Sequence, residues 1–488
     1  MALAFIAFGF FVEGQQHGSS IVVLATSDVR VEMSAGIHAP QLLSISGPSV
    51  SSWRNSASEA FPDHVEIAGT SVPIAWALRP ESGSIDSHRV VFVYESAQPY
   101  LILRWQWEAR AEFGPVEHRI SIENLSGQEI WLPMIDSLSL DWQEPADHVL
   151  RHFYVEKGAD SPSAVGTHFE NVVDNYGWTG KSSTYAHPIA GEAREIIPVE
   201  FVFNTAEPHA GWFAGIEFSG RTRITLYRHR TDLKSTLGLN PEPGPFRTRL
   251  ITGDRFETPT VFLGAFTGGP DGAGNQLRPW VRTVLNNPLT WNDPHYPLLV
   301  NNSWGSGMQV DETLALRMIA ESKELGLEMF GLDAGWFRGV GDWYPDPKKF
   351  PRGLAYVSDE AHKQGLRFGI WVDWSQAALD NQPGALNVRD PKVRNWVVGD
   401  LGPDWKPEEF KGQTIDIGVP AAHDYAAKEV KRLVEDNHLD MLEHDGYLVA
   451  QGCTRDDHPH APPNKSTLHL THDSGFDFSL GSNSTDVS

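Results

Sequence analysis

The chain has 488 residues, of which 40% are apolar and 21% charged, and these values are typical of a globular protein with two or three domains. The net charge of −24 excludes nucleic acid as a partner, because binding to a polyanion depends on Lys and Arg that neutralise phosphates. The 17 tryptophans instead favour a carbohydrate partner, since indole faces stack well on sugar rings.

Residues 1–20 are expected to be a signal segment or an irregular N-terminus. They contain an apolar core, but no Lys or Arg precedes it and the small-residue cleavage site is weak. The location therefore stays open between cytoplasmic and secreted. Cys453 is the single cysteine, which excludes a disulfide within the chain. No later stretch is apolar enough to span a membrane, so we expect no membrane partner.

Residues 21–285 are expected to form an N-terminal antiparallel β-sandwich. In "YLILRWQWEAR", residues 100–110, apolar side chains alternate with polar or smaller ones, which predicts a strand with one buried face. Stretches such as "HRVVFVYES", "VEHRISIEN" and "PVEFVFN" follow the same pattern. A short helix is expected at "GNQLRPWVRTVL", residues 274–285, and the Pro- and Asn-rich residues 286–297 read as a linker.

Residues 298–452 change to alternating strands and helices, which predicts the first four strands of a partial TIM (β/α)8 barrel. The helix "DETLALRMIAESKEL" has Asp311 as its cap and ends at Gly326. A polar or acidic residue follows each predicted strand, at the end where such barrels build their active sites. Residues 453–488 read as a polar tail.

Carboxylates and indoles dominate these strand ends, and this combination suits glycoside hydrolysis. We find no nucleophile elbow, no P-loop, no H-E-x-x-H motif and no dinucleotide fingerprint. In a retaining glycosidase one carboxylate attacks the sugar, and a protonated carboxyl group gives its proton to the leaving oxygen. The two carboxyl groups lie about 5–5.5 Å apart.

Several motifs together resemble glycoside hydrolase family 36, the family of α-galactosidases. They are "NNSWGSG", "LGLEMFGLDAGWF", "GDWYPDPKKFPRGL", "HKQGLRFGIWVDW" and "LDMLEHDG", which cover most of residues 297–448 in the family's order. Upstream, "ITGDRFETPTVFLGAFTGG" is similar to the last part of the family's N-terminal β-sandwich. The resemblance implies retaining hydrolysis of terminal α-linked galactose or a related sugar, and we expect neither a cofactor nor a metal.

The resemblance also implies roles for individual residues. Asp445 matches the family's nucleophile, and Asp333 matches the first of two adjacent Asp residues that hold sugar hydroxyls. Trp371 matches the aromatic wall of the sugar pocket, and Asp373 stands where the family usually has Glu. Lys411 is the cation nearest to the position of an expected Arg.

Two departures from the family pattern affect sugar recognition. The second of the adjacent Asp residues is here Ala334, and the Lys two residues before the nucleophile is here Glu443. A Glu accepts hydrogen bonds that a Lys would donate. If both are buried and close, it also disfavours ionisation of Asp445. Galactose is therefore the family default and does not follow from these residues. His444, between the two acids, is expected to be a packed or exposed neighbour.

The family's general acid is not recognised in this chain. A complete barrel needs around 250 residues, whereas about 190 follow residue 297. We therefore expect a chain truncated within its barrel, with poor or absent hydrolysis.

Two other functions stay open on the sequence. One is a non-catalytic carbohydrate-binding relative. The other is a metal-dependent barrel hydrolase that uses the His-rich tail, although irregular spacing and prolines favour a solvated loop there. The sequence also leaves open whether the chain forms a homo-oligomer.

Overall fold

The computed structural model describes residues 21–145, 147–156, 166–182, 195–218, 221–241, 247–285, 293–379, 384–397, 412–417 and 419–444. The predicted N-terminal segment 1–20, most of the linker (residues 286–292) and the polar tail 453–488 lie outside these residues. No helix of the described part is long and apolar enough to cross a membrane.

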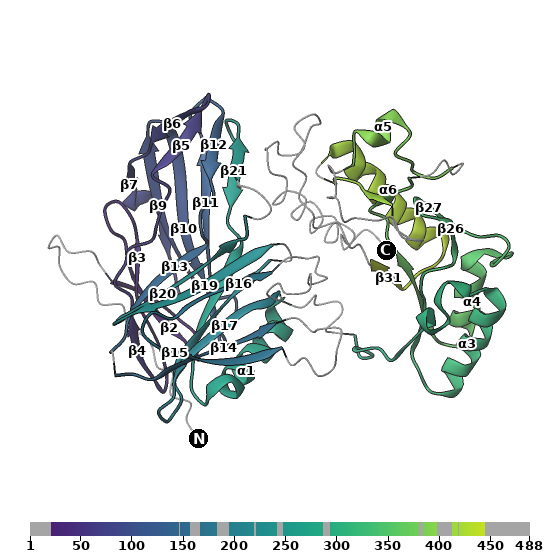
Figure 1. The fold of residues 1–488 in the computed structure, drawn as a ribbon, viewed down its shortest axis with the longest axis horizontal. Helices are drawn as coiled ribbons and strands as arrows, with labels where there is room; N and C mark the ends of the chain where they lie inside the picture. The colour runs from purple at the N-terminus through teal and green to yellow at the C-terminus, as the bar shows by residue number, and fades with distance from the viewer. Residues whose placement is uncertain are drawn as a thin grey trace, which may run out of the picture.

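The N-terminal part consists of antiparallel sheets (Figure 1). The largest has 11 strands. They are β7 (Trp76–Leu78), β8 (Ser84–Ile85), β9 (Arg89–Ala97), β10 (Tyr100–Glu108), β11 (Val116–Asn124), β14 (Leu150–Glu156), β15 (Thr167–Val172), β17 (Ile196–Asn204), β18 (Gly211–Glu217), β22 (Arg255–Glu257) and β23 (Thr260–Phe266). The 3-10 turn η1 (Pro80–Ser82) precedes β8.

Three sheets of four strands complete this part. The first contains β1 (Ile21–Ala25), β2 (Arg30–Ser34), β3 (Gln41–Gly47) and β4 (Val50–Arg54). The second contains β5 (His64–Ile67), β6 (Thr70–Pro73), β12 (Ile130–Pro133) and β21 (Arg247–Leu250). The third contains β13 (Leu138–Gln143), β16 (Gly177–Ser182), β19 (Thr222–His229) and β20 (Asp232–Leu239).

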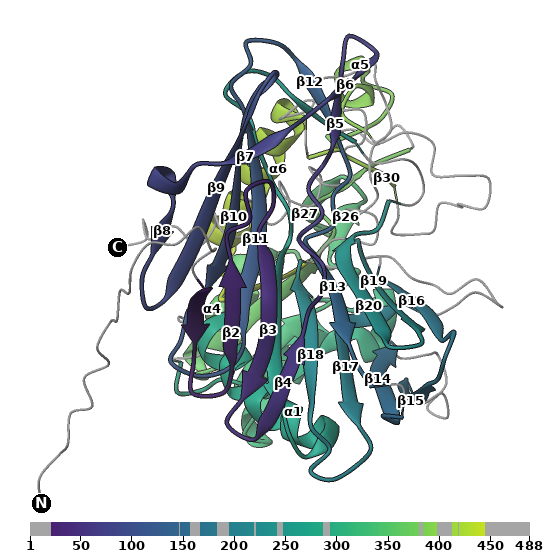
Figure 2. The ribbon, with the colours of Figure 1, turned by 90° about the vertical axis from the view of Figure 1, so that its left-hand side faces the viewer.

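The alternation seen in the sequence sets the faces of the central strands. Leu101, Leu103, Trp105 and Trp107 of β10 are fully buried in the main core. Strand β10 pairs with β9 on one side and β11 on the other, and Figure 2 shows the three long strands side by side. A shift of one residue in this pairing would turn the apolar set to the opposite face, so the pattern specifies the register.

Helix α1 (Gly269–Trp280) begins five residues before the predicted start at residue 274. Pro270 stands at the beginning of the helix, where a missing N–H costs nothing, so the helix extends back to the preceding turn. A π-helical turn, η2 (Val281–Leu285), continues it. Trp280 and Ala273 pack against a cluster of phenylalanines from the large sheet, which gives that sheet a second, smaller core.

The C-terminal part is built on a parallel sheet in the order β24-β25-β28-β31. Its strands are β24 (Val300–Asn302), β25 (Met329–Leu332), β28 (Arg367–Val372) and β31 (Met441–His444). Helices α3 (Glu312–Glu324), α4 (Gly353–Lys363) and α6 (Pro420–Asp436) lie between successive strands in the chain. Shorter elements are η3 (Ser303–Gln309), β26 (Phe337–Gly339), β27 (Asp342–Pro345), β29 (Gln376–Ala377), α5 (Pro391–Arg394) and β30 (Gln413–Thr414).

The sequence signals for the first of these helices are confirmed. The Asp311 side chain accepts a hydrogen bond from the Leu314 N–H at 2.8 Å, and Gly326 follows the helix with a φ of +73°. Buried residues of the sheet and of all three helices form one core, which is separate from the core of the β-sandwich. The predicted fold class, a β-sandwich followed by a partial (β/α) barrel, is thus confirmed.

Candidate functional site

A polar residue directly follows each strand of the parallel sheet. Ser303 follows β24, Asp333 follows β25 and Asp373 follows β28. All three are buried, with Asp333 8% and Asp373 1% exposed. Because neighbouring parallel strands end at the same edge of the sheet, these three residues lie together at that edge.

Asp333 is held by the neighbouring strand end and by its own loop. Its N–H donates to the Ser303 hydroxyl oxygen at 2.9 Å, which links the ends of β24 and β25. Its carboxylate Oδ1 accepts the Ala334 N–H at 2.7 Å. One carboxylate oxygen is therefore used to shape the turn.

Asp373 is almost completely buried, and a buried carboxylate needs hydrogen-bond donors. The Ser375 hydroxyl donates to its Oδ1 at 2.5 Å, and the Asp373 carbonyl accepts the Gln376 N–H at 3.2 Å. These two hydrogen bonds hold the loop after β28 against Asp373.

Trp371 belongs to an aromatic cluster beside these carboxylates. Its ring lies parallel to Phe337 with centroids 5.8 Å apart, and its edge meets Trp343 at 6.2 Å. The indole of Trp336 donates to the Trp371 carbonyl at 2.8 Å. Phe337 and Trp343 come from the β26–β27 hairpin, so this hairpin packs directly against the C-terminal end of strand β28. Only 3% of Trp371 is exposed.

Strand β31 brings Glu443 and His444 next to β28. Glu443 is half-buried and pairs in register with Trp371. The His444 ring is exposed and stacks on Trp374 with centroids 4.6 Å apart, and its Nδ1 lies 3.3 Å from the Val372 carbonyl oxygen. His444 thus packs against the loop that follows Asp373.

Asp445 and Lys411 lie outside the described residues, so their predicted roles are taken up as proposals below. Asp445 is the residue next to His444, the last residue of β31. The residue after Lys411 is described: the Gly412 N–H donates to the Gln376 side-chain oxygen at 2.9 Å. A Cβ at Gly412 would lie 2.1 Å from the Ala377 carbonyl oxygen, so only glycine permits this approach.

Four side chains around the site have no predicted role in the sequence: Ser303, Lys349, Ser375 and Gln376. The two serines lie within or directly after recognised motifs, and a search for donors beside the carboxylates could have found them. Lys349 and Gln376 act on backbone groups of other loops. No local pattern marks such contacts.

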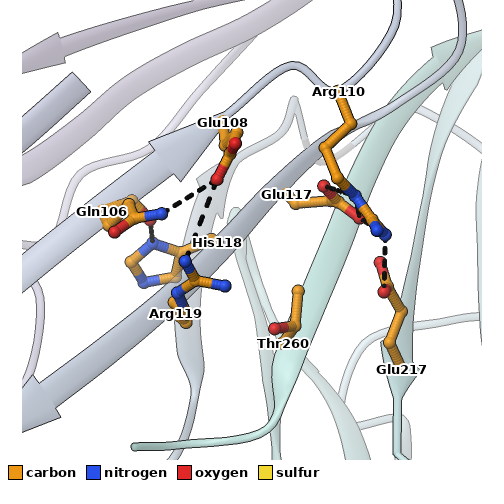
Figure 3. A pocket seen from close by; sticks show the side chains of 8 residues that line it. All are labelled: Gln106, Glu108, Arg110, Glu117, His118, Arg119, Glu217 and Thr260. Atoms are coloured by element: carbon orange, nitrogen blue, oxygen red, sulfur yellow. Dashed lines mark hydrogen bonds and ion pairs between the residues drawn. The ribbon is translucent and has the colours of Figure 1, made fainter. Parts of the chain in front are cut away.

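A separate pocket of about 100 Å³ lies on the β-sandwich (Figure 3). It is lined by Gln106, Glu108, Arg110, Glu117, His118, Arg119, Glu217 and Thr260. Its charged groups already pair with one another. Arg110 bridges Glu117 and Glu217, and Arg119 lies 3.9 Å from Glu108. Burial and the neighbouring Glu117 raise the pKa of Glu217 to about 9. With these charges balanced and no indole, phenyl or phenol ring in the lining, the pocket lacks the features of a sugar site.

Metal chemistry finds no support in the part of the chain that the structure covers. Among those residues, no group of three or more His, Cys, Asp or Glu could hold a metal ion. The His-rich tail on which the metal-dependent alternative depends lies outside the described residues.

Comparison with known proteins points to one family. A model described as melibiase matches residues 255–464. α-Galactosidase 2 of Pediococcus pentosaceus is 29% identical over 248 residues, which cover 49% of this chain and 32% of that protein. α-Galactosidase AgaA of Geobacillus stearothermophilus is 26% identical over 280 residues, covering 55% of this chain and 36% of AgaA. The chain thus spans about a third of the length of the curated relatives it matches.

Solved structures share the fold. The crystal structure of the family 36 α-galactosidase AgaA from G. stearothermophilus superposes with a TM-score of 0.73 at 17% identity, over 94% of this chain and 70% of that one. The α-galactosidase of Lactobacillus brevis gives 0.75 at 16% identity, over 96% and 69%.

A β-sandwich joined to parallel β/α units, with carboxylates gathered at the strand ends, is typical of barrel glycoside hydrolases. Within this class the family model, the relatives and the shared fold agree, and the chain is similar to the α-galactosidases of glycoside hydrolase family 36. The resemblance seen in the sequence motifs is confirmed.

Proposed function

We propose that this chain carries the substrate-binding half of a retaining α-galactosidase, which hydrolyses terminal α-linked galactose or a related sugar by double displacement. The observation that supports this most directly is the convergence of Asp333 and Asp373 at adjacent strand ends, beside the Trp371 cluster. Carboxylates accept hydrogen bonds from sugar hydroxyls, and the aromatic cluster forms an apolar edge.

In the proposed mechanism, the Asp445 carboxylate attacks the anomeric carbon as the bond to the leaving oxygen breaks. A general acid, which we do not assign to any described residue, gives its proton to that oxygen. Water then displaces Asp445 from the glycosyl intermediate and the acid regains its proton. Asp333, Asp373 and Lys411 hold the sugar hydroxyls during both steps, and Glu443 contacts the ring from β31.

Ligands of a structural relative support the choice of sugar. Variants of AgaA have been crystallised in complex with stachyose, raffinose and 1-deoxygalactonojirimycin. These ligands support a carbohydrate as the partner of the present chain. Ala334 and Glu443 alter the recognition of hydroxyl groups, and a sugar related to galactose is therefore included in the proposal.

A second candidate is carbohydrate binding without turnover. Ala334 and Glu443 favour it, because one hydroxyl-binding carboxylate is missing and the charge beside the nucleophile is reversed. An activated aryl α-galactoside distinguishes the two, since its leaving group needs little help from an acid. Release of the aryl group supports the hydrolase, and sugar binding without release supports the second candidate.

The decisive experiment is covalent labelling of Asp445. A mechanism-based α-galactoside inactivator should add one label to the full 488-residue chain, measured by intact-protein mass spectrometry, and Asp445→Asn should abolish the label. Asp424→Asn, an exposed position on α6, is the matched control and should label like the unsubstituted chain. Labelling that persists in Asp445→Asn would show that another residue is the nucleophile.

A further inference from the structure

The four residues of the loop that carries Asp333 are each fixed by a hydrogen bond. Asp333 donates to Ser303, and Ala334 donates to the Asp333 carboxylate. Trp336 receives the Asp346 N–H on its carbonyl at 2.8 Å and donates its indole N–H to Trp371. The remaining residue, Gly335, is held by a side chain from a distant loop.

That side chain is Lys349. Its ammonium donates to the Gly335 carbonyl at 2.7 Å and to the Met308 carbonyl at 2.6 Å. Met308 lies in η3, the turn that follows β24, and Gly335 lies in the loop that follows β25. Lys349 therefore joins the loops after the first two strands of the parallel sheet.

The two loops touch at the place where Lys349 binds them. Gly335 has a φ of +113°, and a Cβ there would lie 2.8 Å from the Met308 Cα. The backbones are thus in close contact, and any opening between them would separate the two carbonyls that share one ammonium. An ammonium can donate to both at once, and its charge strengthens both bonds.

The backbone of Lys349 ties the same loop to a third element. Its carbonyl accepts the Glu312 N–H, at the start of α3, at 2.9 Å. Its N–H donates to the Asp346 carbonyl at 3.0 Å within its own turn. These backbone hydrogen bonds fix the turn that carries Lys349, and so they fix the position of its ammonium beside the Asp333 loop.

We propose that Lys349 is a positioning residue of the sugar site: it fixes the Asp333 loop against η3 so that the carboxylate is preorganised for sugar hydroxyls. This assignment rests on the proposed function, in which Asp333 contacts the sugar. Lys349 itself is not assigned a contact with the sugar.

The first test is a double-mutant cycle on galactose binding, measured by isothermal titration calorimetry with the full chain. Lys349→Met should weaken binding about tenfold, and Asp333→Asn should weaken it at least as much. If Lys349 acts through Asp333, then Lys349→Met should add little to Asp333→Asn, because coupled residues are not additive. Lys349→Arg keeps the charge and should recover part of the affinity for galactose. Lys348→Met, at the exposed neighbouring position, should leave the affinity for galactose unchanged. Fully additive effects would overturn the assignment.

The second test does not depend on the sugar. Hydrogen–deuterium exchange should become faster in residues 303–309 and 333–336 of Lys349→Met, and should stay unchanged in Lys348→Met. Unchanged exchange in Lys349→Met would overturn the role of Lys349 even if the chain binds galactose. Absence of binding to galactose and to related sugars by the unsubstituted chain would instead overturn the proposed function, whatever the exchange shows.

Discussion

At the scale of single residues, Glu443 is the most consequential departure from the family pattern. It lies half-buried on β31, in register with Trp371, and two residues before the proposed nucleophile. A carboxylate at this position can only accept hydrogen bonds when ionised, whereas the Lys that the family has there can only donate. The hydroxyl pattern that the site recognises should therefore differ from that of the relatives.

Reversing this charge tests the point. Glu443→Lys should raise the affinity for galactose about tenfold, which is the order expected for a restored hydrogen bond to a charged group. The measurement is calorimetric titration with galactose. Glu324→Lys, at an exposed position on α3, carries the same charge change and should have no effect. A loss of affinity in Glu443→Lys would mean that this site recognises its sugar through the Glu.

At the scale of secondary-structure elements, the strands of the β-sandwich enclose ionisable groups. Glu200 of β17 and His152 of β14 are fully buried, with Oε2 and Nε2 3.6 Å apart. Burial raises the pKa of Glu200 to about 8 and lowers the pKa of His152 to about 3. Burial thus favours the neutral form of both groups and disfavours an ion pair between them. The Ser235 hydroxyl, from β20, donates to Glu200 at 2.5 Å.

The raised pKa of Glu200 predicts how the stability of the sandwich depends on pH. Between the ordinary pKa of 4.5 and about 8, the folded chain keeps a proton that the unfolded chain loses. The contribution of Glu200 to the free energy of unfolding is therefore complete below pH 4.5 and is lost as the pH rises to about 8. The free energy of unfolding falls by at most about 1.4 kcal/mol for each pH unit in this range. Glu200→Gln removes this loss, because an amide does not titrate.

Thermal unfolding of both proteins from pH 5 to pH 8 measures the effect. The unfolding midpoint of Glu200→Gln should rise relative to the unsubstituted chain across this range, while the exposed control Glu81→Gln should follow the unsubstituted chain. Parallel curves for Glu200→Gln and the unsubstituted chain would show that Glu200 is ionised in the folded state.

At the scale of the whole molecule, the described residues form two large cores that share no residue. One lies within the β-sandwich, and the other joins the parallel sheet to α3, α4 and α6. Cores of this kind can unfold independently, because each has its own set of long-range contacts.

Differential scanning calorimetry should therefore show two transitions for the full chain. Saturating galactose should raise only the transition of the β/α part, since a ligand stabilises the unit that binds it. If both transitions shift together, the two parts unfold as one cooperative unit. If only the sandwich transition shifts, the sugar site lies outside the parallel sheet.

Much of the architecture could be predicted because its determinants are local. Apolar residues at alternate positions of residues 100–110 predict a strand, although its second face is also partly buried at Ile102 and Gln106. The Asp311 cap and Gly326 mark the ends of α3. The strand-end positions of Asp333 and Asp373 follow from the same periodicity. The roles of Asp445 and Lys411 stay predictions that rest on the family resemblance.

The sequence by itself determined the order of strands and helices, the type of each sheet and the carboxylates at the strand ends, because periodicity and capping act over a few neighbouring residues. Only the tertiary structure decided which groups hold those carboxylates. Ser303 lies 30 residues from Asp333, and Lys349 lies 41 residues from Met308. Contacts over such distances exist only after the β/α units have packed, since packing alone brings the loops of separate strands to one edge of the sheet.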